Sequence, residues 1–181
     1  MAYEMIHSQK KYHGKAFDVR QDQVRLPDGQ TINLDIVEHV GAVTLIPVDE
    51  TGRIWFVRQY RHATGKMLLE LPAGTIEPGE PPDDCALREI REETGMACKV
   101  LKKVGEFYLA PGYSTEYMYV FQATGLYPAP LPGDVDEFLS IEKIPLEQAF
   151  RMAESGEIQD AKTLAGLFFL RSKTTGQVVL E

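Results

Sequence analysis

The chain has 181 residues, with 27 acidic and 19 basic side chains, a formal net charge of −8 and two cysteines. Its length and its apolar fraction of 44% suffice for one domain with a hydrophobic core, which excludes a disordered chain. The negative charge argues against nucleic acid as a partner, and the apolar runs are too short to cross a bilayer. Two cysteines make no disulfide framework, and the N-terminus does not resemble a signal peptide. We therefore expect a cytoplasmic protein with no membrane partner.

The first strands predicted in chain order form a hairpin. Residues 17–26 and 31–39 both have the pattern of strands, and Pro27-Asp28-Gly29-Gln30 between them is a strong turn sequence. A hairpin alone is only marginally stable, so it must pack against its own domain or against a second subunit. We expect residues 1–40 to form a small N-terminal β-hairpin lobe and residues 41–181 to form a larger domain.

The larger domain is predicted to combine strands with helices. Strands are expected at residues 41–48, 53–60, 66–71, 99–109, 117–124 and 137–144. Helices are expected at residues 81–94, 146–155 and 160–173, the last with Asp160 as its N-cap. Strands first, one helix in the middle and two helices at the end indicate an α/β (α+β) fold in which helices cover a mixed sheet.

The negative charge is concentrated in residues 74–96, which have a net charge of −5, whereas the other 158 residues have a net charge of −3. On a helical wheel three carboxylates lie beside the apolar stripe that we expect to face the core: Glu89, Glu92 and Glu93 next to Ala86, Leu87, Ile90 and Thr94. Such carboxylates repel one another. Two explanations fit this acidic face of the helix: the carboxylates are solvated, or they bind a divalent cation such as Mg²⁺ or Mn²⁺, which prefers carboxylate oxygens. The spacing alone leaves both explanations open.

The residues around these glutamates form a longer motif. The segment reads Gly74, five residues, Glu80, seven residues, Arg88-Glu89-Ile90, one residue, Glu92-Glu93, one residue, Gly95-Met96. It resembles the Nudix box, the loop–helix–loop motif of the Nudix hydrolases, and every fixed position of the family pattern is filled. The resemblance implies an α/β/α sandwich with a mixed sheet. It also implies metal-dependent hydrolysis of nucleoside diphosphates that are linked to another moiety.

The resemblance implies a role for each residue of the box. Glu89, Glu93 and the backbone carbonyl of Ala73 would hold the metal, which we expect to be Mg²⁺, with Mn²⁺ as a possible substitute. Arg88 would hold the motif together by an ion pair rather than contact substrate, and Glu80 would lie close to the metal ligands. The bound metal would lower the pKa of a water molecule and make the pyrophosphate electrophilic.

The base that activates this water is left open between two glutamates. Glu92 lies on the helix of the box. Glu137 matches a loop glutamate that approaches the metals in related enzymes, so it is also a candidate metal ligand, and Asp136 is close behind it. Either base must lie within hydrogen-bond reach of the attacking water.

Three segments outside the box resemble the ADP-ribose pyrophosphatase branch of the family: residues 57–61, 70–74 and 110–116. Pro111 follows Met96 by 15 residues, which is the position of a proline that marks specificity for ADP-sugars in the family. Arg61 is the candidate ligand of the substrate diphosphate, because a guanidinium matches phosphate oxygens. Thr75 and Glu116 would contact substrate by the same resemblance. Taken alone, Arg61 also fits a surface arginine and Glu116 a solvated strand residue.

We therefore predict a Mg²⁺-dependent Nudix hydrolase of nucleotide metabolism that splits ADP-ribose into AMP and ribose 5-phosphate. Enzymes of this branch commonly exchange the N-terminal lobe between subunits, so we expect a homodimer. One alternative is hydrolysis of another nucleoside diphosphate derivative, such as a GDP-sugar, NADH or an oxidised nucleotide. Another is a non-catalytic nucleotide-binding sensor, against which the intact box argues.

Overall fold

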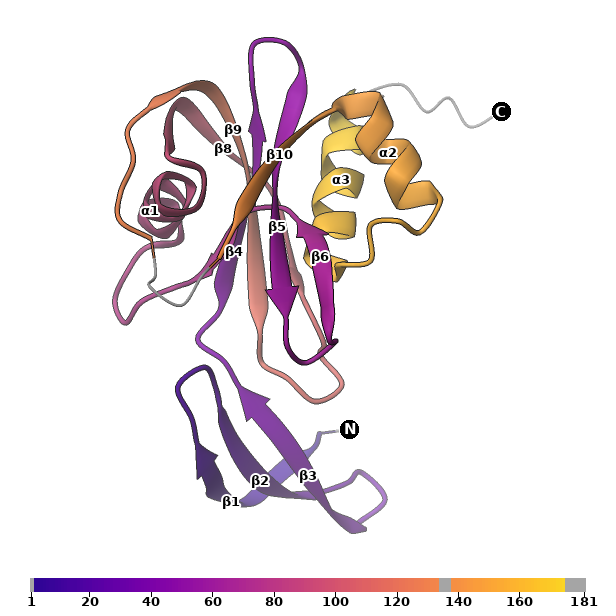
Figure 1. Cartoon of the computed structure of the whole chain (residues 1–181). Coiled ribbons are helices and arrows are strands. Elements are labelled where there is room, and N and C mark those ends of the chain that lie inside the picture. Colours follow the sequence, from indigo (N-terminus) through magenta and orange to yellow (C-terminus); the bar gives the residue numbers. More distant parts are fainter. Residues whose placement is uncertain (1, 134–137, 175–181) are drawn as a thin grey trace. The chain divides into compact units, whose positions relative to one another are not determined.

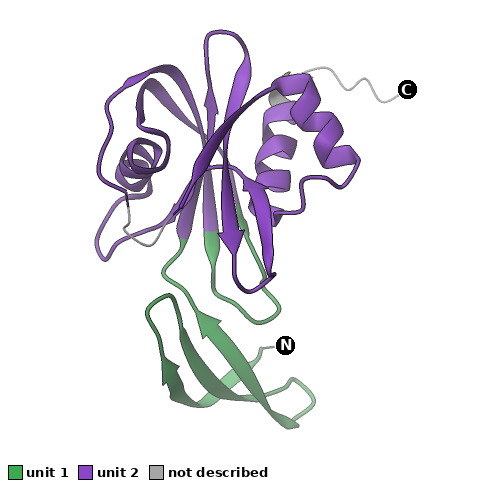
Figure 2. Cartoon of the chain, viewed as in Figure 1, with its two compact units in different colours: residues 1–41, 107–117 green, residues 42–106, 118–181 purple. Residues whose placement is uncertain are grey.

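The computed structural model describes residues 2–133 and 138–174. The chain divides into two compact units, one of residues 1–41 and 107–117 and the other of residues 42–106 and 118–181 (Figure 2). Residues 107–117 join the first unit because the backbone of Val37 hydrogen-bonds with Tyr113 and Thr115, at 2.8 and 3.0 Å. The sequence predicts no such association, since hydrogen bonds between distant backbone segments have no sequence pattern.

The first unit contains a three-stranded antiparallel sheet formed by β1 (Glu4–His13), β2 (Asp18–Arg25) and β3 (Thr31–Glu38). β2 and β3 make the predicted hairpin, and Gly29 in its turn has a φ of +89°, which favours glycine. β1 was not predicted. Its residues are exposed at every position, so the strand has no buried face whose apolar residues would mark it in the sequence.

The second unit is built on a mixed sheet, as the sequence predicts. Its strand order is β10-β5-β4-β9-β8, with β6 paired to β5 and β7 paired to β4. β4 runs parallel to β9 and antiparallel to β5 and β7. The bounds of these strands are β4 (Ala42–Val48), β5 (Arg53–Arg61), β6 (Lys66–Glu70), β7 (Ala73–Thr75), β8 (Met96–Tyr108), β9 (Tyr117–Pro128) and β10 (Ser140–Pro145).

Helices cover both faces of this sheet, which confirms the α/β/α sandwich (Figure 1). On one face Val43 and Leu45 of β4 share a core cluster with Ile90 of α1. Gly166 of α3 lies near Ile46 of β4, on the other face. Side chains alternate along a strand, so β4 is buried on both faces. In the described part of the chain, no helix is long and apolar enough to cross a membrane. The helices are α1 (Pro82–Thr94), α2 (Leu146–Glu154) and α3 (Ala161–Thr174).

The ends of α1 follow local rules, whereas its buried face departs from the helical wheel. Pro82 opens the helix, and Gly95 ends it in the left-handed conformation with a φ of +71°. Leu87, which the wheel assigns to the core, is 40% exposed, and that prediction was wrong. Ala86 is buried as predicted, and the small Cys85 is buried in place of Leu87, so the buried side of α1 lies closer to the glutamates.

Candidate active site

Two glutamates of α1 lie against the backbone of β7. Glu93 Oε2 accepts a hydrogen bond of 3.1 Å from the backbone N–H of Ala73. A Cβ atom on Gly74 would lie 1.8 Å from Cδ of Glu89, so only glycine leaves room for this carboxylate. Both glutamates are 8% exposed. The structure thus brings together the three residues that the resemblance implies as metal ligands.

Arg88 connects the remaining carboxylates of the box. Its Nε and Nη2 atoms each donate to Glu80 at 2.9 Å, and Nη1 donates to Glu92 at 2.9 Å and to Glu89. Nη2 also donates to the backbone carbonyl of Thr75 at 3.2 Å. These hydrogen bonds hold the pKa of Glu80 at about 2, well below its ordinary value. The guanidinium is therefore the internal counterion of the box, and it engages the carboxylate of Glu92.

The donors at this site fit a hard divalent cation. Within residues 2–133 and 138–174, no group of three or more His, Cys, Asp and Glu residues is arranged to hold a metal ion. Mg²⁺ does not require one, because it is commonly held by one or two carboxylates and completes its shell with water and substrate phosphates. Glu89, Glu93 and the carbonyl of Ala73 would be such a set, with two carboxylates and one carbonyl oxygen.

Within the described residues, Arg61 at the end of β5 is hydrogen-bonded along one edge of its guanidinium. Its Nε and Nη2 atoms donate to the two carboxylate oxygens of Glu70, at 2.8 and 2.7 Å. Burial of Glu70 would raise the pKa of its carboxyl, but hydrogen bonds and charge from Arg61 and Lys162 hold this pKa below its ordinary value. The side chain of Arg61 is 42% exposed, whereas that of Glu70 is 1% exposed. Arg61 is therefore an oriented guanidinium with one edge open, and not a loose surface arginine.

The other candidate residues are distributed over the chain. Thr75 is exposed at the end of β7. Pro111 and Glu116 belong to the first unit, in the segment 107–117, where the backbone N–H of Glu116 donates to the Ser114 hydroxyl at 3.1 Å. Glu137 lies outside the described residues.

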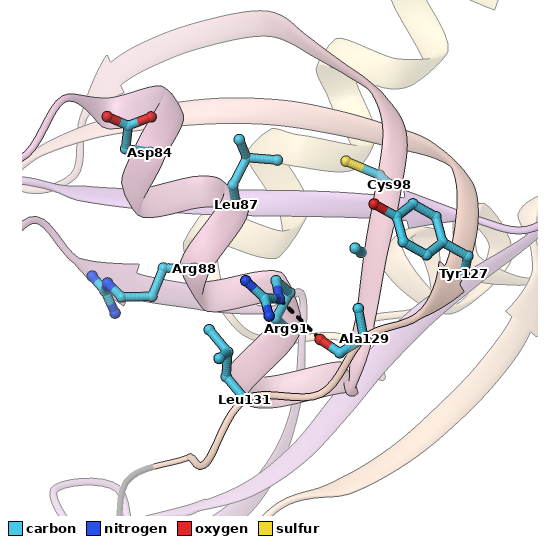
Figure 3. Close-up of a pocket in the computed structure, with 9 residues that line it drawn as sticks. Asp84, Leu87, Arg88, Arg91, Cys98, Tyr127, Ala129 and Leu131 are labelled. Carbon is cyan, nitrogen blue, oxygen red and sulfur yellow. Dashed lines mark hydrogen bonds between the residues drawn. The ribbon is translucent and has the colours of Figure 1, made fainter.

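A pocket of about 510 Å³ lies beside α1, next to the start of β8 and the chain that follows β9 (Figure 3). Leu87 and Arg91 of α1 line it, and Arg91 Nε donates to the carbonyl of Ala129 at 2.9 Å. The α1 side chains in its lining are Asp84, Leu87, Arg88 and Arg91 rather than the three glutamates, so this pocket is distinct from the candidate metal site.

The sequence reasoning gave no role to Glu70 or Lys162. Glu70 lies in the segment 70–74 that carries the family resemblance, but an isolated glutamate after a strand has no signature of burial. Lys162 lies two residues after the predicted N-cap Asp160. Its Nζ donates to the carboxylates of Glu70 and Asp160. No spacing rule relates Lys162 to Glu70, because 92 positions of sequence separate them.

A family model for the NUDIX domain matches residues 38–167 of the chain. The chain belongs to the Nudix family. It is 38% identical to the ADP-ribose pyrophosphatase of Bacillus subtilis over 170 residues, which cover 93% of this chain and 92% of that protein. It is also 38% identical to the ADP-ribose pyrophosphatase of Mycobacterium tuberculosis over 177 residues, covering 96% of this chain and 86% of that protein.

Two further comparisons concern a relative with another substrate and a solved structure. The Nudix chain is 38% identical to the GDP-mannose pyrophosphatase of an Enterobacter species over 140 residues, which cover 72% of this chain and 73% of that protein. A crystal structure of an ADP compounds hydrolase superposes with a TM-score of 0.87 at 24% identity, over 99% of this chain and 98% of that one. This last likeness shows the shared fold.

Proposed function

We propose that this Nudix hydrolase cleaves the pyrophosphate of ADP-ribose to AMP and ribose 5-phosphate, with Mg²⁺ as its cofactor. The observation that carries the proposal is the pair Glu89 and Glu93, buried against the backbone of Ala73 and Gly74. The substrate is supported by the two relatives that are ADP-ribose pyrophosphatases and that match the chain over more than nine tenths of its length.

The contacts of the side chains suggest which residues bind the metal, which bind the diphosphate and which accept the proton. Bound Mg²⁺ would supply a water of lowered pKa and would polarise the diphosphate. Glu89 and Glu93 would hold the ion, and Arg61 would bind a diphosphate oxygen through the edge that Glu70 leaves open. Glu92 and Glu137 are the two candidates for the group that takes the proton of the attacking water, and Glu92 accepts a hydrogen bond from Arg88.

The proposal extends to three further residues that would contact the substrate. Thr75 at the end of β7 and the pair Pro111 and Glu116 in the segment 107–117 are assigned this role by their match to the ADP-ribose branch. We also infer that Mn²⁺ can replace Mg²⁺, because both are hard cations that accept the same oxygen ligands. A cytoplasmic location stays a prediction from the sequence.

A substrate panel tests the proposed function. ADP-ribose, GDP-mannose, NADH and an oxidised nucleotide are incubated with the full chain and Mg²⁺, and with a chelator, and products are separated by ion-exchange chromatography. We expect ADP-ribose to have the highest kcat/KM, to yield AMP, and to be left intact in the chelator. Faster hydrolysis of GDP-mannose would contradict the substrate, and binding of ADP-ribose without hydrolysis would favour the sensor.

A homodimer formed through residues 1–40 belongs to the same proposal, with residues 41–181 as the catalytic domain. β1 is exposed along its whole length, and large apolar side chains on and beside it are exposed: Tyr3, Met5, Ile6 and Tyr12. Such a surface is typical of a protein interface. We expect sedimentation velocity to give the mass of a dimer, and a stable monomer would rule the proposal out.

A further inference from the structure

The first turn of α3 holds the end of β6 at two consecutive residues. Asp160 Oδ2 accepts hydrogen bonds from the N–H and the hydroxyl of Thr163, at 2.9 and 2.6 Å, which caps the helix. The same hydroxyl accepts a bond of 2.8 Å from the backbone N–H of Leu71. Next to it, Lys162 Nζ donates to Glu70 and, at 3.0 Å, to Asp160. Both Glu70 and Leu71 are thus tied to α3.

Glu70 connects this helix to Arg61. Its carboxylate is nearly inaccessible to water, with 1% of the side chain exposed, and the side chain of Lys162 is 11% exposed. The Oε2 atom of Glu70 is shared by Lys162 and by Nη2 of Arg61. Because Lys162 and Arg61 both bind the buried carboxylate of Glu70, its rotation is restricted. The two hydrogen bonds from Arg61 then fix the plane of the guanidinium.

The consequence of this arrangement is an arginine that is ordered before substrate arrives. Nη1 of Arg61 has no hydrogen-bond partner within the described part of the chain, and the side chain is 42% exposed. An arginine that is free to rotate would lose conformational entropy on binding a phosphate, and a fixed one has lost it already. The charge matters too. Among the described residues, Glu70 forms ion pairs with Arg61 and Lys162, and without Lys162 only Arg61 would balance this buried carboxylate.

We propose that Lys162 is a positioning residue for substrate binding, which acts by holding Glu70 so that Arg61 presents its open edge to the diphosphate. Lys162 itself does not touch the substrate. The inference rests on the proposed function, because it takes Arg61 as the ligand of the diphosphate. The inference adds that Lys162 of α3, 92 positions after Glu70 in the sequence, sets the affinity for substrate.

A double-mutant cycle tests this role. The variants are Lys162→Met, Arg61→Met and the double variant, with Lys102→Met, an exposed lysine of β8, as the matched control. We expect Lys162→Met to raise KM for ADP-ribose about tenfold and to change kcat by less than about twofold, since it removes binding that substrate and transition state share. In the Arg61→Met background the same change should leave KM unaltered, because coupled residues are non-additive. The control should match wild type.

The outcomes of the cycle distinguish the positioning role of Lys162 from the proposed hydrolysis of ADP-ribose. An unchanged KM in Lys162→Met, or an equal rise of KM in both backgrounds, overturns the positioning role while wild-type hydrolysis of ADP-ribose upholds the proposed function. A wild-type chain that is inactive on ADP-ribose overturns both. Where circular dichroism shows that Lys162→Met is unfolded, Lys162→Gln decides in its place, because it keeps a hydrogen-bond donor and removes the charge.

Discussion

Replacing Glu93 by glutamine is expected to abolish turnover and to spare the fold. The amide oxygen of the introduced side chain can still accept the bond from the N–H of Ala73, so the contact between α1 and β7 survives. The substitution removes the negative charge that would hold the metal, and an amide is a poor ligand for Mg²⁺ in place of a carboxylate. We expect kcat for ADP-ribose to fall at least about a thousandfold, which corresponds to about 4 kcal/mol of transition-state stabilisation.

Steady-state kinetics with saturating Mg²⁺ would measure this loss, and circular dichroism would verify the fold. Glu50→Gln is the matched control, because Glu50 is an exposed glutamate in the turn after β4 and undergoes the same chemical change. It should retain wild-type kcat. Activity of Glu93→Gln within about tenfold of wild type would remove Glu93 from the metal site.

Gly74→Ala is expected to displace Glu89 while the rest of the domain stays folded. The new Cβ would lie 1.8 Å from both Cδ and Oε1 of Glu89, a distance at which the carboxylate must move. The end of a flexible side chain moves more easily than the backbone of β7, which is paired with β4. A displacement of about 1 Å at a catalytic group costs on the order of a hundredfold in rate, so we expect kcat/KM to fall by about that factor.

A second variant separates displacement of Glu89 from general damage. If Gly74→Ala acts through Glu89, then Gly74→Ala combined with Glu89→Gln should be no less active than Glu89→Gln alone, because the two changes affect one interaction. Thermal unfolding followed by circular dichroism should show a midpoint within a few degrees of wild type for Gly74→Ala. A further loss of activity in the double variant would show that Gly74 has a role independent of Glu89.

The parts of this protein that the sequence predicts well depend on neighbouring residues. The hairpin around Gly29 and the ends of α1 at Pro82 and Gly95 follow from turn and capping preferences that act over a few positions. The candidate metal ligands are likewise close in sequence, since Glu89 and Glu93 are one helical turn apart and β7 precedes α1 by a short loop. The helix that carries both glutamates forms where the apolar pattern predicts one.

By itself, the sequence determined the family, the mixed sheet between helices and the candidate metal ligands Glu89 and Glu93. Only the tertiary structure decided which side of α1 is buried, so that Leu87 is exposed and the glutamates are not. Only the tertiary structure placed Lys162 on Glu70 and thereby oriented Arg61. The reason is that such contacts join elements that are far apart in the chain. Their geometry depends on how a helix seats on a sheet, and no local preference of the residues involved records it.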